Sequence, residues 1–254
     1  MWFEKAKQLI AGVEGEIGLL VKNLASGETF AYGEGTVFPS ASTIKVPILL
    51  TLLDAAAEGR VDLNAASPVS KADIVGGCGI VQFLSEKIPF TLLDHATMMI
   101  DLSDNTATNQ LIANVGMDRV NAKCRELGLK DTVLGRKLMD FEAKKQGRDN
   151  FTSCADMLVI FETIHKNPER YALALKLLKQ QMLNDLLPLL TVPDEFEFAH
   201  KTGDLGGVRH DVGIMYLRDP IFIAFMSKNL KRDLDGIRLA NEVGLLIYNE
   251  FKAS

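Results

Sequence analysis

A serine and a lysine three residues apart, in the segment Ser42-Thr43-Ile44-Lys45, could form a nucleophile and its base. On a helix, residues three apart share a face, so the Lys45 amine can reach the Ser42 hydroxyl. A serine needs such a base, and burial or a second cation can lower the pKa of a lysine enough for it to serve. Alone the motif is weak, since roughly one such spacing is expected by chance in a chain of this size. The alternative is a helix-capping serine beside a solvated lysine.

A second group, Ser103-Asp104-Asn105, falls in a short break between two segments with helical periodicity. Ser103 could relay a proton to a leaving nitrogen, and Asn105 could bind a substrate carbonyl or orient Lys45. We expect Asp104 to be structural and to hold the turn. The tripeptide also reads as a helix cap, a role that can coexist with catalysis.

A third group, Lys201-Thr202-Gly203, lies at the end of a predicted strand. Lys201 supplies a cation and Thr202 a hydroxyl for a substrate carboxylate, while Gly203 lets a substrate approach the strand closely. The backbone N–H of Asp204 is the expected second oxyanion donor, beside the N–H at the start of the Ser42 helix. As a lone tripeptide, this group would read as a surface turn.

Together the three groups resemble the signature of the penicillin-recognising serine enzymes, specifically the class A β-lactamase-like group. Their order and spacing match, and the glycine-bearing segment 76–80 resembles the family's segment near the site mouth. The resemblance covers most of the chain. It implies a serine hydrolase that opens the β-lactam amide through an acyl-enzyme on Ser42. It also implies a small β-lactam or peptide-like substrate, with neither a cofactor nor a metal.

One loop departs from the family pattern. Class A β-lactamases place a glutamate two residues after an arginine, and an asparagine four residues later, and the glutamate activates the water that frees the acyl-enzyme. Anchored on Arg136, the resemblance puts Leu138 at the glutamate's position and Glu142 at the asparagine's. Leu138 cannot take a proton, so deacylation is expected to be slow or to use another residue. Glu142 could point inward as the base, or it and Asp140 could be solvated loop charges.

The family's carboxylate-binding arginine is also absent from its usual place. Arg209 lies nearby in the sequence and could substitute for it. The alternative is a solvated turn arginine, because the segment from Leu205 to Asp211 reads as a long polar loop.

The elements that must position these groups can be read from hydrophobic periodicity. Helices are predicted over 2–13, from Ser42 onward and over 234–251, with strands over 15–23, 29–38, 196–202, 212–217 and 221–228 and a mostly helical region over roughly 68–190. The strands most simply form one antiparallel sheet, with the terminal helices on one face and the helical insert on the other. The resemblance implies the same α/β (α+β) fold, a five-stranded antiparallel sheet flanked by helices plus an all-α subdomain.

The site would then lie in the groove between these two parts. The chain is interpreted as a single domain over residues 1–254. Its α/β part covers about 1–45 and 195–254, and its helical insert about 46–194.

Composition excludes several other classes. The chain has 254 residues, a net charge of −5 and charges of both signs along its length, which argues against a nucleic-acid binder. The three cysteines have no metal spacing and are expected to be buried free thiols, although a Cys78–Cys124 bridge stays open. No apolar run reaches membrane-spanning length and no signal peptide is visible. A cytoplasmic monomer without membrane partners is therefore expected, or an extracytoplasmic one if an export signal was removed.

Two alternative functions stay open. A DD-peptidase or esterase acting on D-Ala-D-Ala-like or small ester substrates would use the same chemistry, and Leu138 favours it. A penicillin-binding sensor, in which Ser42 is acylated once as a signal, is of another class. A degenerate member with only a structural role is less favoured, because all three motifs are intact. A histidine-based triad is not favoured either, because the G-x-S-x-G elbow is absent.

Overall fold

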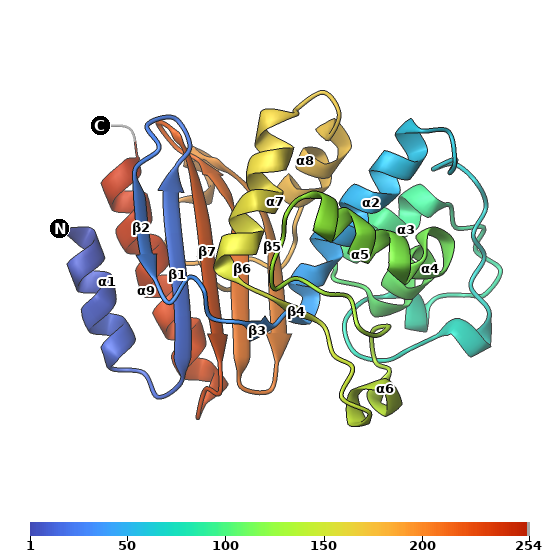
Figure 1. The fold of residues 1–254 in the computed structure, drawn as a ribbon, viewed down its shortest axis with the longest axis horizontal. Coiled ribbons are helices and arrows are strands. Elements are labelled where there is room, and N and C mark those ends of the chain that lie inside the picture. The colour runs from blue at the N-terminus through green and yellow to red at the C-terminus, as the bar shows by residue number, and fades with distance from the viewer. Residues whose placement is uncertain (253–254) are drawn as a thin grey trace.

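The computed structural model describes residues 1–252 and arranges them around a five-stranded antiparallel sheet in the order β2-β1-β7-β6-β5 (Figure 1). The strands are β1 (Glu16–Asn23), β2 (Thr29–Tyr32), β5 (Glu197–Leu205), β6 (Val208–Tyr216) and β7 (Pro220–Lys228), and a separate pair is formed by β3 (Phe38–Pro39) and β4 (Phe151–Thr152). The helices are α1 (Trp2–Ala11), α2 (Lys45–Ala57), α3 (Leu92–Asp101), α4 (Asn105–Val115), α5 (Met117–Glu126), α6 (Phe141–Lys145), α7 (Cys154–Lys166), α8 (Ala172–Lys179) and α9 (Asp233–Phe251). Short 3₁₀ turns are η1 (Ala41–Ile44), η2 (Lys71–Asp73), η3 (Val81–Phe83) and η4 (Pro193–Glu195). The predicted antiparallel sheet is confirmed.

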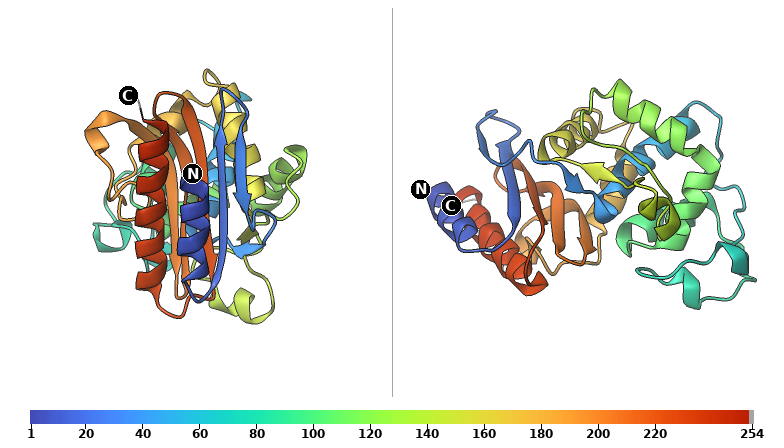
Figure 2. Two further views of the ribbon diagram at one scale, coloured as in Figure 1. Left: turned by 90° about the vertical axis from the view of Figure 1, so that its left-hand side faces the viewer. Right: turned by 60° about the horizontal axis from the view of Figure 1, so that its bottom comes forward.

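Both faces of the sheet are covered, and the period-two pattern of its central strands explains why. In β7, Ile223 and Phe225 belong to the core under α1 and α9, whereas Phe222 and Ala224 belong to the core on the opposite face. The terminal helices lie side by side against one face, and α7 lies against the other (Figure 2). This agrees with the predicted placement of the terminal helices.

The helical part is organised around α2. Every residue from Lys45 to Ala55 is buried, as expected for a helix surrounded by protein on all sides. Helices α3, α4, α5 and α8 contact it. The first turn of α2 follows directly after the 3₁₀ turn that carries Ser42, and it already lies in the core. The surroundings of Lys45 therefore fix its position.

Two predicted boundaries are wrong. The strand expected over 29–38 ends at Tyr32, because the chain turns at Gly33, where φ is 61° and a Cβ would lie 2.7 Å from the Ile17 carbonyl oxygen. The polar loop expected over 205–211 is instead the end of a β-hairpin. Strands β5 and β6 continue to Leu205 and Val208, and only two glycines join them. The polar residues there lie in the ladder at the exposed end of the hairpin.

The three cysteines differ in their burial. Cys124 and Cys154 are buried, but Cys78 is half-buried, so the expectation of three buried thiols is wrong for Cys78.

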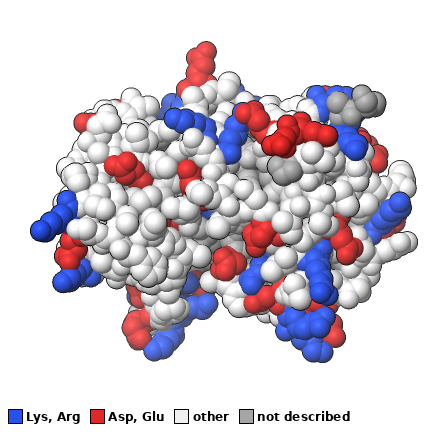
Figure 3. Space-filling model, turned by 180° about the vertical axis from the view of Figure 1, so that it is seen from behind, with Lys and Arg blue, Asp and Glu red and all other residues white. Residues whose placement is uncertain are grey.

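The face shown in Figure 3 carries acidic and basic side chains interspersed, without a field of one sign. Within residues 1–252, no helix combines the length and the apolar character that crossing a bilayer requires.

Candidate active site

Ser42 sits in the tight turn η1, between the short strand β3 and helix α2. Its side chain is only 9% exposed. The preceding Ala41 has φ 45°, a left-handed conformation that a non-glycine residue adopts only where its surroundings impose it. Edge strand β5 lies directly against this turn, since a Cβ on Gly203 would be 3.0 Å from the Ser42 backbone nitrogen. The structure thus gives Gly203 a second reason to lack a side chain, besides the predicted approach of a substrate.

Four oxygen atoms surround the Lys45 amine. Its Nζ lies 2.9 Å from Ser42 Oγ, 3.0 Å from Ser103 Oγ, 2.7 Å from the Ser103 carbonyl oxygen and 3.0 Å from Asn105 Oδ1. Lys45 is fully buried. Residues 58 and 60 positions away in the sequence therefore converge on one nitrogen.

These contacts suit a neutral amine. Two of the four oxygens accept only, so they can take the two N–H groups of a neutral lysine, and the nitrogen lone pair is left for a hydroxyl proton. Burial, and next the positive charge of Lys201, hold the pKa of Lys45 well below its ordinary value. The arrangement can accept the proton of Ser42 as its oxygen attacks.

The Ser103-Asp104-Asn105 turn is held by backbone contacts. Ser103 has φ 54°, and Asp104 caps α4 through the Ala107 N–H while also accepting the N–H groups of Ile80 and Val81 at 2.7 and 2.8 Å. Asp104 is therefore structural, as expected. Asn105 donates to the Gly76 carbonyl oxygen at 3.1 Å and accepts from Lys45, so it orients the lysine against the glycine-bearing loop.

Glycines are required in that loop because it passes very close to the turn. A Cβ on Gly79 would lie 2.2 Å from Asp104, and one on Gly77 would lie 2.7 Å from Asn105 Nδ2. Both glycines also have positive φ angles, 109° and 85°. The half-buried Cys78 between them lies at the site mouth.

Lys201 is fully buried on β5, and its Nζ has no hydrogen-bond partner among residues 1–252. Burial lowers the pKa of Lys201 to about 8. A cation held without a partner can receive a substrate anion. Thr202 follows on the same strand, which is the edge of the sheet, and is 6% exposed.

Replacing Lys201 with methionine is expected to stabilise the fold by about 3 kcal/mol near neutral pH, because the folded state lowers the pKa of a lysine it must bury. The unfolded chain holds this proton to higher pH than the folded chain does. Wild-type stability therefore rises with pH above about 8, and the gain from methionine shrinks. Urea unfolding of both proteins at several pH values measures this difference. Equal stability at neutral pH would contradict it.

A cavity of about 390 Å³ opens beside Ser42. Its lining residues are Ala41, Ser42, Gly77, Cys78, Asn105, Arg136, Leu138, Met139, Phe141, Lys144, Asp149, Asn150, Asp204, Leu205, Gly206, Arg209 and Asp233. Arg209 lines it but is engaged: its guanidinium lies 3.1 Å from Asp233 and donates to two backbone carbonyl groups of its own hairpin. The structure thus places Arg209 at the rim in an ion pair.

Leu138 lies in this cavity at a fixed position. Asn109 on α4 holds its backbone from both sides, accepting the Leu138 N–H at 2.9 Å and donating to its carbonyl oxygen at 3.0 Å. The following Met139 has φ 64°. The sequence did not predict this role of Asn109, because an asparagine within a helical segment gives no indication of a contact with a residue 29 positions away.

Glu142 points away from the cavity. Asp140 caps α6, and this short helix buries Ala143, so the neighbouring Glu142 faces solvent. Its side chain is 77% exposed and lies 2.7 Å from Lys145. Because Glu142 is exposed and does not line the cavity, this position does not support the predicted role of Glu142 as the deacylating base.

Glu142→Gln is accordingly expected to leave the lifetime of an acyl-enzyme within about twofold of wild type, since most exposed charges contribute little. The decay of a preformed Ser42 adduct, followed by mass spectrometry, measures this. Decay slowed by a hundredfold, the lower range for loss of a general base, would restore Glu142 to the mechanism.

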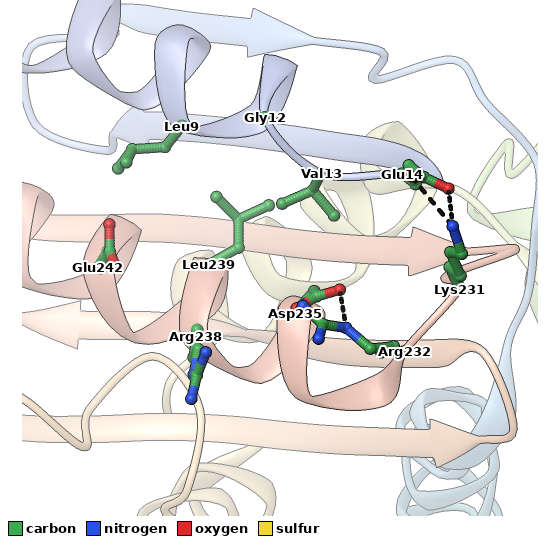
Figure 4. Close-up of a pocket in the computed structure, with 10 residues that line it drawn as sticks. All are labelled: Leu9, Gly12, Val13, Glu14, Lys231, Arg232, Asp235, Arg238, Leu239 and Glu242. Atoms are coloured by element: carbon green, nitrogen blue, oxygen red, sulfur yellow. Dashed lines mark hydrogen bonds and ion pairs between the residues drawn. The ribbon is translucent and has the colours of Figure 1, made fainter.

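A second cavity, of about 510 Å³, lies between α1 and α9 (Figure 4), and Ser42 is not among the residues that line it. Four of its six charged side chains form two pairs, Glu14 with Lys231 and Arg232 with Asp235, as the dashed lines in Figure 4 show. It holds no nucleophile–base pair. Among the described residues there is also no cluster of histidine, cysteine and carboxylate groups that could hold a metal ion.

Comparisons with known proteins agree with this geometry. Residues 2–251 match the model of the beta-lactamase enzyme family. A β-lactamase of Bacillus licheniformis is 28% identical over 229 residues, which cover 87% of this chain and 74% of that protein. Beta-lactamase PSE-4 of Pseudomonas aeruginosa is 31% identical over 59% of this chain, and the match spans about half (54%) of that relative.

The solved structure of PBP-A is similar over nearly the whole chain. It has a TM-score of 0.88 and 31% sequence identity, and the match covers 98% of this chain and 95% of that one. A leucine-to-glutamate variant of PBP-A, solved as an acyl-enzyme complex with penicillin G, is 30% identical, with the same TM-score and coverage.

Proposed function

The chain belongs to the beta-lactamase enzyme family, and from this premise we propose that it opens β-lactams by acyl transfer to Ser42 and releases the product slowly. Class A-like serine hydrolysis is the reaction type. The substrate is a small β-lactam, and the enzyme acts as a monomer without a nucleic-acid or membrane partner.

The acylation step follows from the contacts around Lys45. Neutral Lys45 takes the Ser42 proton as Oγ attacks the lactam carbonyl carbon. The backbone N–H groups of Ser42 and Asp204 stabilise the oxyanion. As the carbon–nitrogen bond breaks, Ser103, 3.0 Å from the lysine, passes a proton to the leaving nitrogen.

Substrate binding uses Lys201, whose amine has no hydrogen-bond partner within residues 1–252. Lys201 and Thr202 on the edge strand receive the substrate carboxylate. Asn105 orients Lys45 and the glycine-bearing loop. The observation that carries the proposal is the buried amine of Lys45, placed 2.9 Å from Ser42 Oγ with its N–H groups engaged elsewhere.

Two carboxylates near the site that are already engaged, together with Leu138, support slow release. Asp149 lines the cavity but lies 2.7 Å from Arg136 and 3.3 Å from Lys144, so ion pairs engage it. Asp104 is engaged by three backbone N–H groups. Leu138 occupies the position where the family resemblance expects the water-activating glutamate.

A second candidate function is a peptidase or esterase of the penicillin-binding-protein type. Leu138 favours it, and so does the similarity to PBP-A over nearly the whole chain. Such an enzyme would pass the same acyl group from a D-Ala-D-Ala-like peptide or an ester to Ser42.

The test compares a chromogenic cephalosporin with a peptide ending in D-Ala-D-Ala, using wild type and Ser42→Ala. Slow cephalosporin opening that disappears in the variant supports the β-lactamase reading. Release of D-alanine that depends on Ser42, without cephalosporin turnover, supports the peptidase. Equal activity of wild type and Ser42→Ala on both substrates defeats both proposals.

A further inference from the structure

We infer that this enzyme selects acyl donors whose acyl side chain is neutral and apolar, and that Phe141 and Leu205 provide the surface on which that side chain packs. This inference rests on the proposed function, because it assumes that the acyl group is carried by Ser42. It concerns the part of the cavity that the acylation chemistry does not use.

The cavity beside Ser42 has an apolar wall. Leu138, Met139, Phe141 and Leu205 all line it. Phe141 is 57% exposed and Leu205 is 37% exposed. Scattered exposed apolar residues need no explanation, but two that line one cavity together with two half-buried apolar residues indicate a binding surface.

The wall is fixed before any ligand arrives. Met139 reaches across to the glycine-bearing loop, where a Cβ on Gly77 would lie 3.3 Å from the Met139 sulfur. Asn109 holds the backbone of Leu138, and the Asp140 cap fixes the start of α6 at Phe141. A preformed surface loses little conformational entropy on binding, so apolar contact there converts into affinity.

The three cations that line this cavity all lie in ion pairs, although two of them share one carboxylate. Arg136 and Lys144 both pair with Asp149, and Arg209 pairs with Asp233. Each distance is 3.3 Å or less. An acidic acyl side chain would have to compete with Asp149 or Asp233 for these cations, which reduces the attraction that they offer it.

One further charge acts against an acidic side chain. Asp204 lines the same cavity, is exposed, and forms no ion pair among residues 1–252. Asp204 lies on β5, three residues after Lys201. A negative acyl side chain that enters this cavity would therefore approach a like charge, and such repulsion is one way for a site to reject one substrate while it accepts another.

The experiment measures second-order acylation rates of Ser42 by intact-protein mass with three penicillins. These are benzylpenicillin, carbenicillin (benzylpenicillin with one added carboxylate) and the bare penicillin nucleus without an acyl side chain. Benzylpenicillin is expected to react about tenfold faster than either of the others. In Phe141→Ser and Leu205→Ser, these ratios should fall at least about threefold.

Phe83→Ser is the matched control, since Phe83 is 78% exposed and lies outside the residues lining the cavity. It should keep the wild-type ratios. If the nucleus, carbenicillin and benzylpenicillin label Ser42 equally fast, or if neither wall variant changes the ratios, the inference fails while the proposed function stands. If no penicillin labels Ser42, both fail.

Discussion

Replacing Leu138 with glutamate is expected to shorten the lifetime of the Ser42 acyl-enzyme by about a hundredfold, the lower range of what a positioned general base contributes. Leu138 lines the cavity that contains Ser42, and Asn109 holds its backbone on both sides. A glutamate there would start from a fixed backbone, and its half-buried surroundings would raise its pKa toward that of a useful base. Decay of the adduct mass after removal of free β-lactam measures the lifetime.

Leu138→Gln is the control, because glutamine has the same shape but accepts no proton. Its adduct should live as long as that of wild type. If the glutamine variant deacylates as fast as the glutamate variant, the gain comes from altered packing. If Leu138→Glu leaves the lifetime unchanged, position 138 does not reach the attacking water.

The second large effect concerns Lys45. Lys45→Met is expected to lower the acylation rate by about a thousandfold, within the range for loss of a general base. In wild type, acylation should slow as pH falls through the pKa of Lys45, because only the neutral amine accepts the Ser42 proton. Since burial and Lys201 hold that pKa well below its ordinary value, the rate should reach its plateau below the pH at which an ordinary lysine loses its proton.

Stopped-flow acylation across pH measures this profile. Lys176→Met, at an exposed lysine on α8, is the control and should match wild type. Lys45→Arg tests the role more finely, because arginine keeps the charge but cannot give up its proton. An arginine variant with wild-type acylation would show that Lys45 acts as a charge and not as a base.

Much of the fold could be predicted because its signals are local. A continuous apolar run marks β7, and helical stripes mark α3 and α9. Boundaries failed where tertiary contacts decide. The strand after β1 ends early because Gly33 packs against the Ile17 carbonyl, and the β5–β6 hairpin continues through polar residues that read as a loop.

Some features of the candidate site could likewise be predicted from the sequence, and others could not. The convergence of Ser103 and Asn105 on Lys45 was expected from motif resemblance, since no local pattern joins residues so distant in the chain. The orientation of Glu142 could not be read from the sequence. It follows from which side of a five-residue helix is buried, and that side is set by Ala143.

Arg209 shows a similar limit. The sequence offered a substrate ligand or a solvated turn residue, and the structure shows an ion pair with Asp233 across the end of the hairpin. That pair forms because β6 packs next to the start of α9. The spacing of residues within either segment does not predict it.

The proposed function requires that Ser42 is acylated readily and freed slowly. The most direct measurement is the intact mass of the protein over time after one addition of benzylpenicillin, with peptide mapping of the modified residue. We expect a stoichiometric adduct on Ser42 that outlasts the free drug and is absent in Ser42→Ala. Rapid disappearance of the adduct with hydrolysis of the drug, or an adduct on another residue, would contradict it.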